Sequence, residues 1–195
     1  MKILAAISFL FVFFLFTAAY AQVQYYGIDT VLDEKGRSFV KLTITFERPE
    51  TSFKFNILGR VEKFNMTSIA GPVSCNVDVS GISSIACNMS LTEEKRTVDI
   101  VFETNDFVKV LDNKFYFDVD LSLNKNIDQI FASVRLPEGM AITNETVPGR
   151  LSYPENTTII SDGRHIIVIW RFTDLKSNQP VRLQVLYEQL QIPLP

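Results

Sequence analysis

The amino-acid sequence predicts an all-β protein, an antiparallel β-sandwich that follows an N-terminal signal peptide. Beyond residue 22, apolar and polar residues alternate with period two in nearly every segment, which is typical of strands with one wet face. Turn-forming groups rich in Gly, Pro and Asp separate these segments. No stretch shows a convincing helical period. Both an immunoglobulin-like and a jelly-roll-like sandwich fit this pattern.

The first 21 residues have the features of a secretory signal peptide. Lys2 is followed by an apolar run over residues 3–16 and by the small-residue site Ala19-Tyr20-Ala21, so we expect cleavage before Gln22. The apolar run is shorter than the ~20 residues of a membrane span, which makes a retained anchor the less favoured alternative. Membrane association is therefore expected only through a retained signal peptide or through a partner.

Residues 22–195 are expected to form one β-sandwich domain with about ten to twelve short strands. The polar stretch at residues 124–126 is the alternative place for a subdivision of this domain. The clearest alternating segments are residues 37–46, 51–58, 96–104, 113–123 and 180–190.

Residues 160–170, ISDGRHIIVIW, contain the only histidine and the only tryptophan of the chain. Asp162-Gly163 between two apolar runs predicts a hairpin, with Trp170 in the core and His165 half exposed beside the turn. Without a second histidine or a Gly-x-Ser-x-Gly elbow, the pattern favours a hairpin over a site of chemistry. We therefore expect no catalytic residue, no metal ligand and no cofactor.

The two cysteines, Cys75 and Cys87, are expected to form one structural disulfide, because the chain is exported and lacks a Cys-x-x-Cys pair. The sequence also contains four acceptor motifs for N-glycosylation, and a glycosylated residue has to face solvent. These motifs begin at Asn65, Asn88, Asn144 and Asn156.

Oxygen-bearing side chains recur at every second position from Asp118 to Asp128, as they do in calcium-binding loops. Leu123 and Gln129 stand where an EF-hand loop needs glycine and glutamate, so an amphipathic strand is the favoured interpretation and calcium binding the alternative. Asp118 and Asp120 also share one strand face, at a spacing that a glycosidase carboxylate pair can have. A hydrolase is therefore the third functional alternative.

The segment from Leu183 to Pro195 is expected to be an edge strand of the protein's own sheet. The alternative is that this terminal strand adds to the sheet edge of a neighbouring molecule. The net charge of −3 and the lack of a basic cluster give no support to nucleic-acid binding.

Four stretches in the last third of the chain are LPEG (136–139), YP (153–154), SDGRHIIVIW (161–170) and VLYE (185–188). In these stretches the chain resembles the extracytoplasmic domains of a loosely defined group of archaeal surface proteins. The resemblance implies a β-sandwich and an extracytoplasmic location. Many members continue into a membrane helix and a winged-helix DNA-binding domain, and the sequence reaches Pro195 without them, so no signalling role and no functional residue are carried over.

Taken together, these features predict an exported, glycosylated, non-catalytic recognition or accessory module. We expect it to work at the cell surface, either secreted or on the extracytoplasmic face of the membrane, and to bind a protein or a glycan. The alternative is a structural subunit of an envelope layer or fibre that assembles by strand addition.

Overall fold

The predicted all-β sandwich is confirmed by the computed structural model, which describes residues 22–111, 114–143, 157–177 and 179–190. These ranges contain fourteen strands in three sheets and no helix. No helix long and apolar enough to cross a membrane occurs in the described ranges. The signal peptide predicted at residues 1–21 lies outside them.

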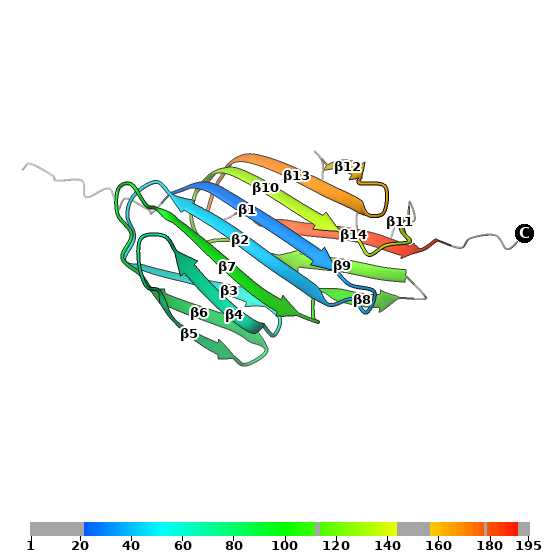
Figure 1. Cartoon of the computed structure of the whole chain (residues 1–195), viewed down its shortest axis with the longest axis horizontal. Coiled ribbons are helices and arrows are strands. Elements are labelled where there is room, and N and C mark those ends of the chain that lie inside the picture. Colours follow the sequence, from blue (N-terminus) through cyan, green and yellow to red (C-terminus); the bar gives the residue numbers. More distant parts are fainter. Residues whose placement is uncertain (1–21, 112–113, 144–156, 178, 191–195) are drawn as a thin grey trace, which may run out of the picture.

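A seven-stranded sheet forms one layer of the sandwich, and a four-stranded and a three-stranded sheet form the other (Figure 1). The order in the large sheet is β12-β13-β10-β1-β2-β7-β4, and the small sheets run β11-β14-β9-β8 and β3-β6-β5. All neighbouring strands are antiparallel except β1 and β10, which run parallel. The strands are β1 (Val23–Leu32), β2 (Ser38–Phe46), β3 (Ser52–Leu58), β4 (Glu62–Ser68), β5 (Ser74–Val79), β6 (Ile82–Asn88), β7 (Thr97–Thr104), β8 (Val108–Leu111), β9 (Lys114–Asp120), β10 (Ile127–Arg135), β11 (Met140–Ile142), β12 (Thr157–Ser161), β13 (Ile166–Leu175) and β14 (Arg182–Gln189).

The core lies between the large sheet and the two small sheets, because each strand turns its apolar side chains toward the opposite layer. Phe46 of β2 meets Phe53 of β3 edge-to-face at 5.4 Å between ring centroids, which joins the large sheet to the three-stranded sheet. Phe107 joins the large sheet to the four-stranded sheet, since its ring lies 6.2 Å from Phe102 of β7 and 6.3 Å from Phe117 of β9. We call the side of the large sheet that faces this core its inner face, and the opposite side its outer face.

The polar stretch at residues 124–126 is part of the crossover from β9, in the four-stranded sheet, to β10, in the large sheet. On one side of this crossover, Tyr26 of β1 donates a hydrogen bond from its hydroxyl to the carbonyl oxygen of Leu121 at 2.9 Å. The pKa of the Tyr26 hydroxyl is raised mainly by complete burial and to a smaller extent by the nearby Asp120 carboxylate. The hydroxyl therefore remains a neutral donor at any physiological pH.

Candidate functional site

The hairpin predicted at residues 160–170 is present. Asp162 Oδ1 accepts hydrogen bonds from the backbone N–H of Arg164 and of His165, at 3.0 and 2.8 Å, and Gly163 adopts a φ of 92° that favours glycine. These two backbone hydrogen bonds lower the pKa of the exposed Asp162 carboxyl to about 2, and the bond from His165 has the larger effect. His165 Nδ1 lies 3.2 Å from Asp162 Oδ2, with 29% of its side chain exposed, so the histidine belongs to the turn.

Trp170 lies in the core as predicted, on the inner face of β13 and with no exposed area. A buried indole N–H usually has a hydrogen-bond partner, and the structure shows none among the described residues. The Tyr187 hydroxyl is likewise buried without a partner in the described part of the chain, and burial raises its pKa. Both side chains are members of the buried hydrophobic core, so we assign them to packing.

The carboxylates considered for hydrolysis are held by neighbouring side chains. Asp118 of β9 accepts a bidentate pair from Arg182 of β14, with Nε–Oδ1 and Nη2–Oδ2 both at 2.8 Å, and Gln184 Nε2 donates to the same Oδ1 at 3.0 Å. The hydrogen bond with Asp118 is the first cause that raises the pKa of Arg182. Asp120 instead accepts hydrogen bonds from the backbone N–H and the hydroxyl of Ser122. Both carboxylates are thus hydrogen-bonded to neighbouring groups of the same chain.

The oxygen-bearing side chains between Asp118 and Asp128 do not converge on one point. Asn126 accepts a hydrogen bond from the backbone N–H of Ser177, and Asp128 accepts one from the amide of Gln22. Across the described ranges, no three His, Cys, Asp or Glu side chains lie close enough to hold a metal ion. The alternation at residues 118–123 therefore reflects a strand and the turn that follows it.

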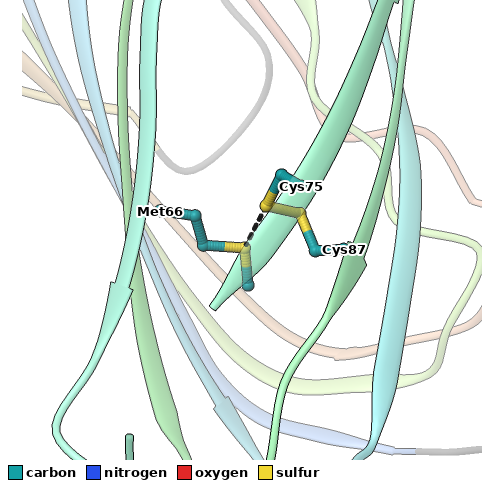
Figure 2. Close-up of a disulfide and its surroundings, with 3 residues drawn as sticks. All are labelled: Met66, Cys75 and Cys87. Atoms are coloured by element: carbon teal, nitrogen blue, oxygen red, sulfur yellow. Dashed lines mark hydrogen bonds between the residues drawn. A yellow bond between two sulfur atoms is a disulfide. The ribbon is translucent and has the colours of Figure 1, made fainter. Parts of the chain in front are cut away.

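The disulfide predicted between Cys75 and Cys87 is present and connects directly opposite residues of β5 and β6 (Figure 2). Met66 of β4 places its Sδ 3.7 Å from Cys75 Sγ. A disulfide sulfur carries no hydrogen, so this approach is a van der Waals contact. The bridge thus packs the three-stranded sheet against the edge of the large sheet.

Two of the predicted glycosylation sites lie on described strands. Asn65 of β4 is exposed on the outer face of the large sheet, and Asn88 at the end of β6 is exposed as well. Asn144 and Asn156 lie outside the described residues.

The prediction of an edge strand at residues 183–195 was wrong for the part that the structure describes. β14 pairs with β9 over residues 182–188 and with β11 over residues 187–189, so it is an inner strand of the four-stranded sheet. Period-two alternation shows which residues share a face of a strand, but it does not show whether other strands pair with both of its edges. Residues 191–195 lie outside the described ranges.

The outer face of the large sheet contains an apolar cluster that the sequence analysis did not single out. Val31 of β1 lies directly opposite Phe39 of β2, and Val101 of β7 lies diagonally beyond Phe39. These three side chains are 43%, 40% and 40% exposed. They border a shallow hollow of roughly 320 Å³ whose rim includes Lys63 and Glu103. We call Val31, Phe39 and Val101 the outer-face cluster.

The charged groups beside the outer-face cluster neutralise each other. Arg37 Nη2 lies 2.5 Å from Glu103 and 3.1 Å from Glu62, and Lys63 Nζ lies 3.0 Å from Glu103. The Arg37 guanidinium also lies 5.8 Å from the centre of the Phe39 ring, which restrains the aromatic side chain. The result is an apolar centre with a balanced polar rim, an arrangement typical of protein interfaces.

The strand pattern alone could have suggested this cluster. In the segment from Arg37 to Phe46, Phe39 occupies a position on the face that otherwise carries Lys41, Thr43 and Thr45. Val31 comes beside Phe39 through the pairing of the consecutive strands β1 and β2, whereas the pairing that brings Val101 beside it joins segments far apart in the chain and is visible only in the folded sheet.

No protein-family model and no curated protein matches the chain. Among solved structures, leukotriene A4 hydrolase from yeast in complex with bestatin aligns with 90% of this chain at a TM-score of 0.53 and 12% identity. A protein from Legionella pneumophila described as nutrient binding aligns with 87% at a TM-score of 0.52 and 9% identity. An M1 zinc metallopeptidase from Deinococcus radiodurans reaches a TM-score of only 0.49 at 10% identity.

The chain spans 30% of the yeast hydrolase, 42% of the Deinococcus metallopeptidase and 67% of the Legionella protein. At these identities the likeness concerns the fold alone. The three-sheet sandwich therefore also occurs as one part of longer proteins.

Proposed function

We propose that the protein is an exported, non-catalytic module, glycosylated at sites other than Asn65, that binds another protein through the outer-face cluster; Asn65 has to stay free of glycan because it lies directly opposite Val101. The observation that carries this proposal is the exposure of Val31, Phe39 and Val101 together on one face of the large sheet. The wet face of an antiparallel sheet is usually polar, and a gathered apolar patch with a polar rim is a common mark of an interaction site.

The charges around the cluster favour a partner with an apolar and nearly neutral contact surface. Arg37, Lys63, Glu62 and Glu103 satisfy each other, so they leave no net field that would attract a polyanion or a strongly basic peptide. A glycan partner would need polar groups around its aromatic platform that are not already engaged. A folded protein domain fits the cluster better, and the occurrence of this fold inside longer proteins supports a neighbouring domain as the partner.

A second candidate function is that of an accessory unit that packs against a hydrolase. It is favoured by the alignment of 90% of this chain with 30% of the yeast leukotriene A4 hydrolase. In this case the partner would supply the catalysis, and the outer-face cluster would be the contact between the two.

Site-specific photo-crosslinking in native envelopes tests both candidates. A photo-reactive phenylalanine analogue replaces Phe39 in the full chain, and the control places it at Asn76, which is exposed on the three-stranded sheet. We expect one discrete adduct from position 39, identified by mass spectrometry as one protein, and none from position 76. Adding Val101→Asp should abolish the adduct, because a charge in the apolar centre opposes its burial.

The identity of the cross-linked protein distinguishes the two candidates. If it is a hydrolase, the result supports the accessory role. If it has no hydrolase activity, the result supports the recognition role. Equal adducts from positions 39 and 76, or none from position 39 in a folded protein, would overturn the proposal. Far-ultraviolet circular dichroism of each variant establishes that it is folded.

A further inference from the structure

The edge strand β12 lacks the protection that the other sheet edges of the described structure have. A free sheet edge invites pairing with another strand, and proteins block it with charges, bulges or short strands. Five of the six edge strands use such a device. β3 contains Lys54, β5 contains Asp78, β8 contains Lys109, β4 has charged residues and a register shift between Glu62 and Asn65, and β11 has three residues.

β12 has the sequence Thr-Thr-Ile-Ile-Ser, without charge, proline or register shift. Four of its five residues are exposed, and Ile159 and Ile160 expose 51% and 46% of their surface. Four of the five are also β-branched, the residue type that most favours strands. The strand is therefore both accessible and well suited to further pairing. In Figure 1 it forms the border of the large sheet next to β13.

The backbone groups that point away from the sheet follow from the hairpin. The backbone N–H of Asp162 donates to the carbonyl oxygen of His165, so this is a hydrogen-bonded pair. Such pairs alternate with non-hydrogen-bonded pairs along an antiparallel ladder, so Ile160 and Thr158 also face β13. Ile159 and Ser161 consequently direct their N–H and C=O groups toward the open edge.

The sequence of β12 is self-complementary in an antiparallel arrangement. When two copies pair about Ile159, Ile159 faces its own counterpart and Thr158 faces Ile160 of the other copy. These pairs combine uncharged side chains, and no like charges meet. The outward-facing backbone groups coincide in this register, which is the condition for hydrogen bonding between the strands.

We propose that β12 pairs with the β12 of a second copy of this chain, in antiparallel orientation about Ile159, and so joins two large sheets edge to edge. The resulting contact is isologous, as in most homodimers. A five-residue strand buries little area, so the dimer forms reversibly and increases with protein concentration. This inference concerns a different surface from the outer-face cluster, and it stands or fails independently of the proposed function.

The glycosylation motif at Asn156 directly precedes β12, since Thr157 and Thr158 are its second and third residues. A glycan on Asn156 would stand next to the pairing edge and oppose the association by its bulk. For this reason the test uses the mature chain with Asn156→Gln as the background for every variant.

Cysteine cross-linking tests the register. Cys75 and Cys87 are already bridged, so a new cysteine would be the only free thiol. Opposite residues of an antiparallel pair have Cα atoms about 4.5–5.5 Å apart, which is within the range of a disulfide. Ile159→Cys should therefore form a covalent dimer under mild oxidation. A mixture of Thr158→Cys and Ile160→Cys should form the mixed dimer, and neither of these two variants should dimerise alone.

The matched control is Val110→Cys on the β8 edge, where Val110 is 66% exposed. Analytical ultracentrifugation gives the second readout, and there Ile159→Lys should weaken dimerisation by about tenfold or more, because two lysines would face each other. Cross-linking of Val110→Cys at the same rate as Ile159→Cys would overturn the proposal. It would equally be overturned by sedimentation of the Asn156→Gln chain as a monomer at every concentration up to the millimolar range.

Discussion

Removal of the disulfide should loosen one corner of the sandwich. Cys75 and Cys87 are 12 residues apart in the chain, and a bridge that closes a loop of this length stabilises by about 3 kcal/mol in the chain-entropy model. For a protein of this size, each kcal/mol corresponds to a melting-temperature shift of about 2–4 °C. We therefore expect Cys75→Ala with Cys87→Ala to lower the melting temperature by about 6–12 °C.

The structure also indicates where the loss should be largest. Strand β5 is an edge strand with mostly exposed side chains, so little apolar burial holds it once the bridge is gone. Native-state hydrogen exchange should accordingly accelerate in β5 and β6 and remain slow in the centre of the large sheet. Reduction of the wild-type protein should reproduce the effect, and the same reductant should leave the double variant unchanged.

A shift of less than about 2 °C, together with unchanged amide exchange in β5, would refute this reasoning. It would mean that the hairpin is held by its strand pairing and by the contact with Met66, and that the bridge adds no restraint.

Three further predictions concern stability. Phe107→Ala should destabilise by about 3–5 kcal/mol in urea unfolding, because Phe107 is 1% exposed and joins two layers, whereas Val110→Ala on the exposed β8 should stay within about 0.5 kcal/mol. The pKa of Asp162 is lowered in the folded protein, so its carboxylate stabilises the fold above about pH 4, and this contribution is lost as the pH falls through about 2. In a plot of the free energy of unfolding against pH, Asp162→Ala should therefore reduce the decline at acidic pH. Arg182→Gln should cost about 1 kcal/mol, because it leaves the Asp118 carboxylate, 10% exposed, without its bidentate partner.

Much of the secondary structure could be predicted because alternation is a local property. The segments at residues 37–46, 51–58 and 96–104 match β2, β3 and β7 to within one residue at each end. The Asp162-Gly163 turn and the Cys75–Cys87 bridge also followed from short stretches whose chemistry admits few conformations. The fourteen strands exceed the expected number partly because β8 and β11, with four and three residues, are too short to show a period.

The functional surface was less accessible to such reasoning. Side chains that alternate along a strand were assigned to a wet or a dry face, but their cross-strand neighbours were unknown. Asp118 looked like a candidate acid until Arg182, 64 residues later, was found to neutralise it. The outer-face cluster likewise needs β7, which is distant in the chain from the consecutive strands β1 and β2.

The sequence by itself determined the all-β class, the disulfide and the hairpin at Asp162, because each depends on residues that are near one another along the chain. Only the tertiary structure decided which strands are edges and which are central, that the second layer is divided into two sheets, and that β12 is the edge without charge. These features depend on pairing between distant segments, and that pairing is selected by the packing of the whole core, which no local pattern encodes.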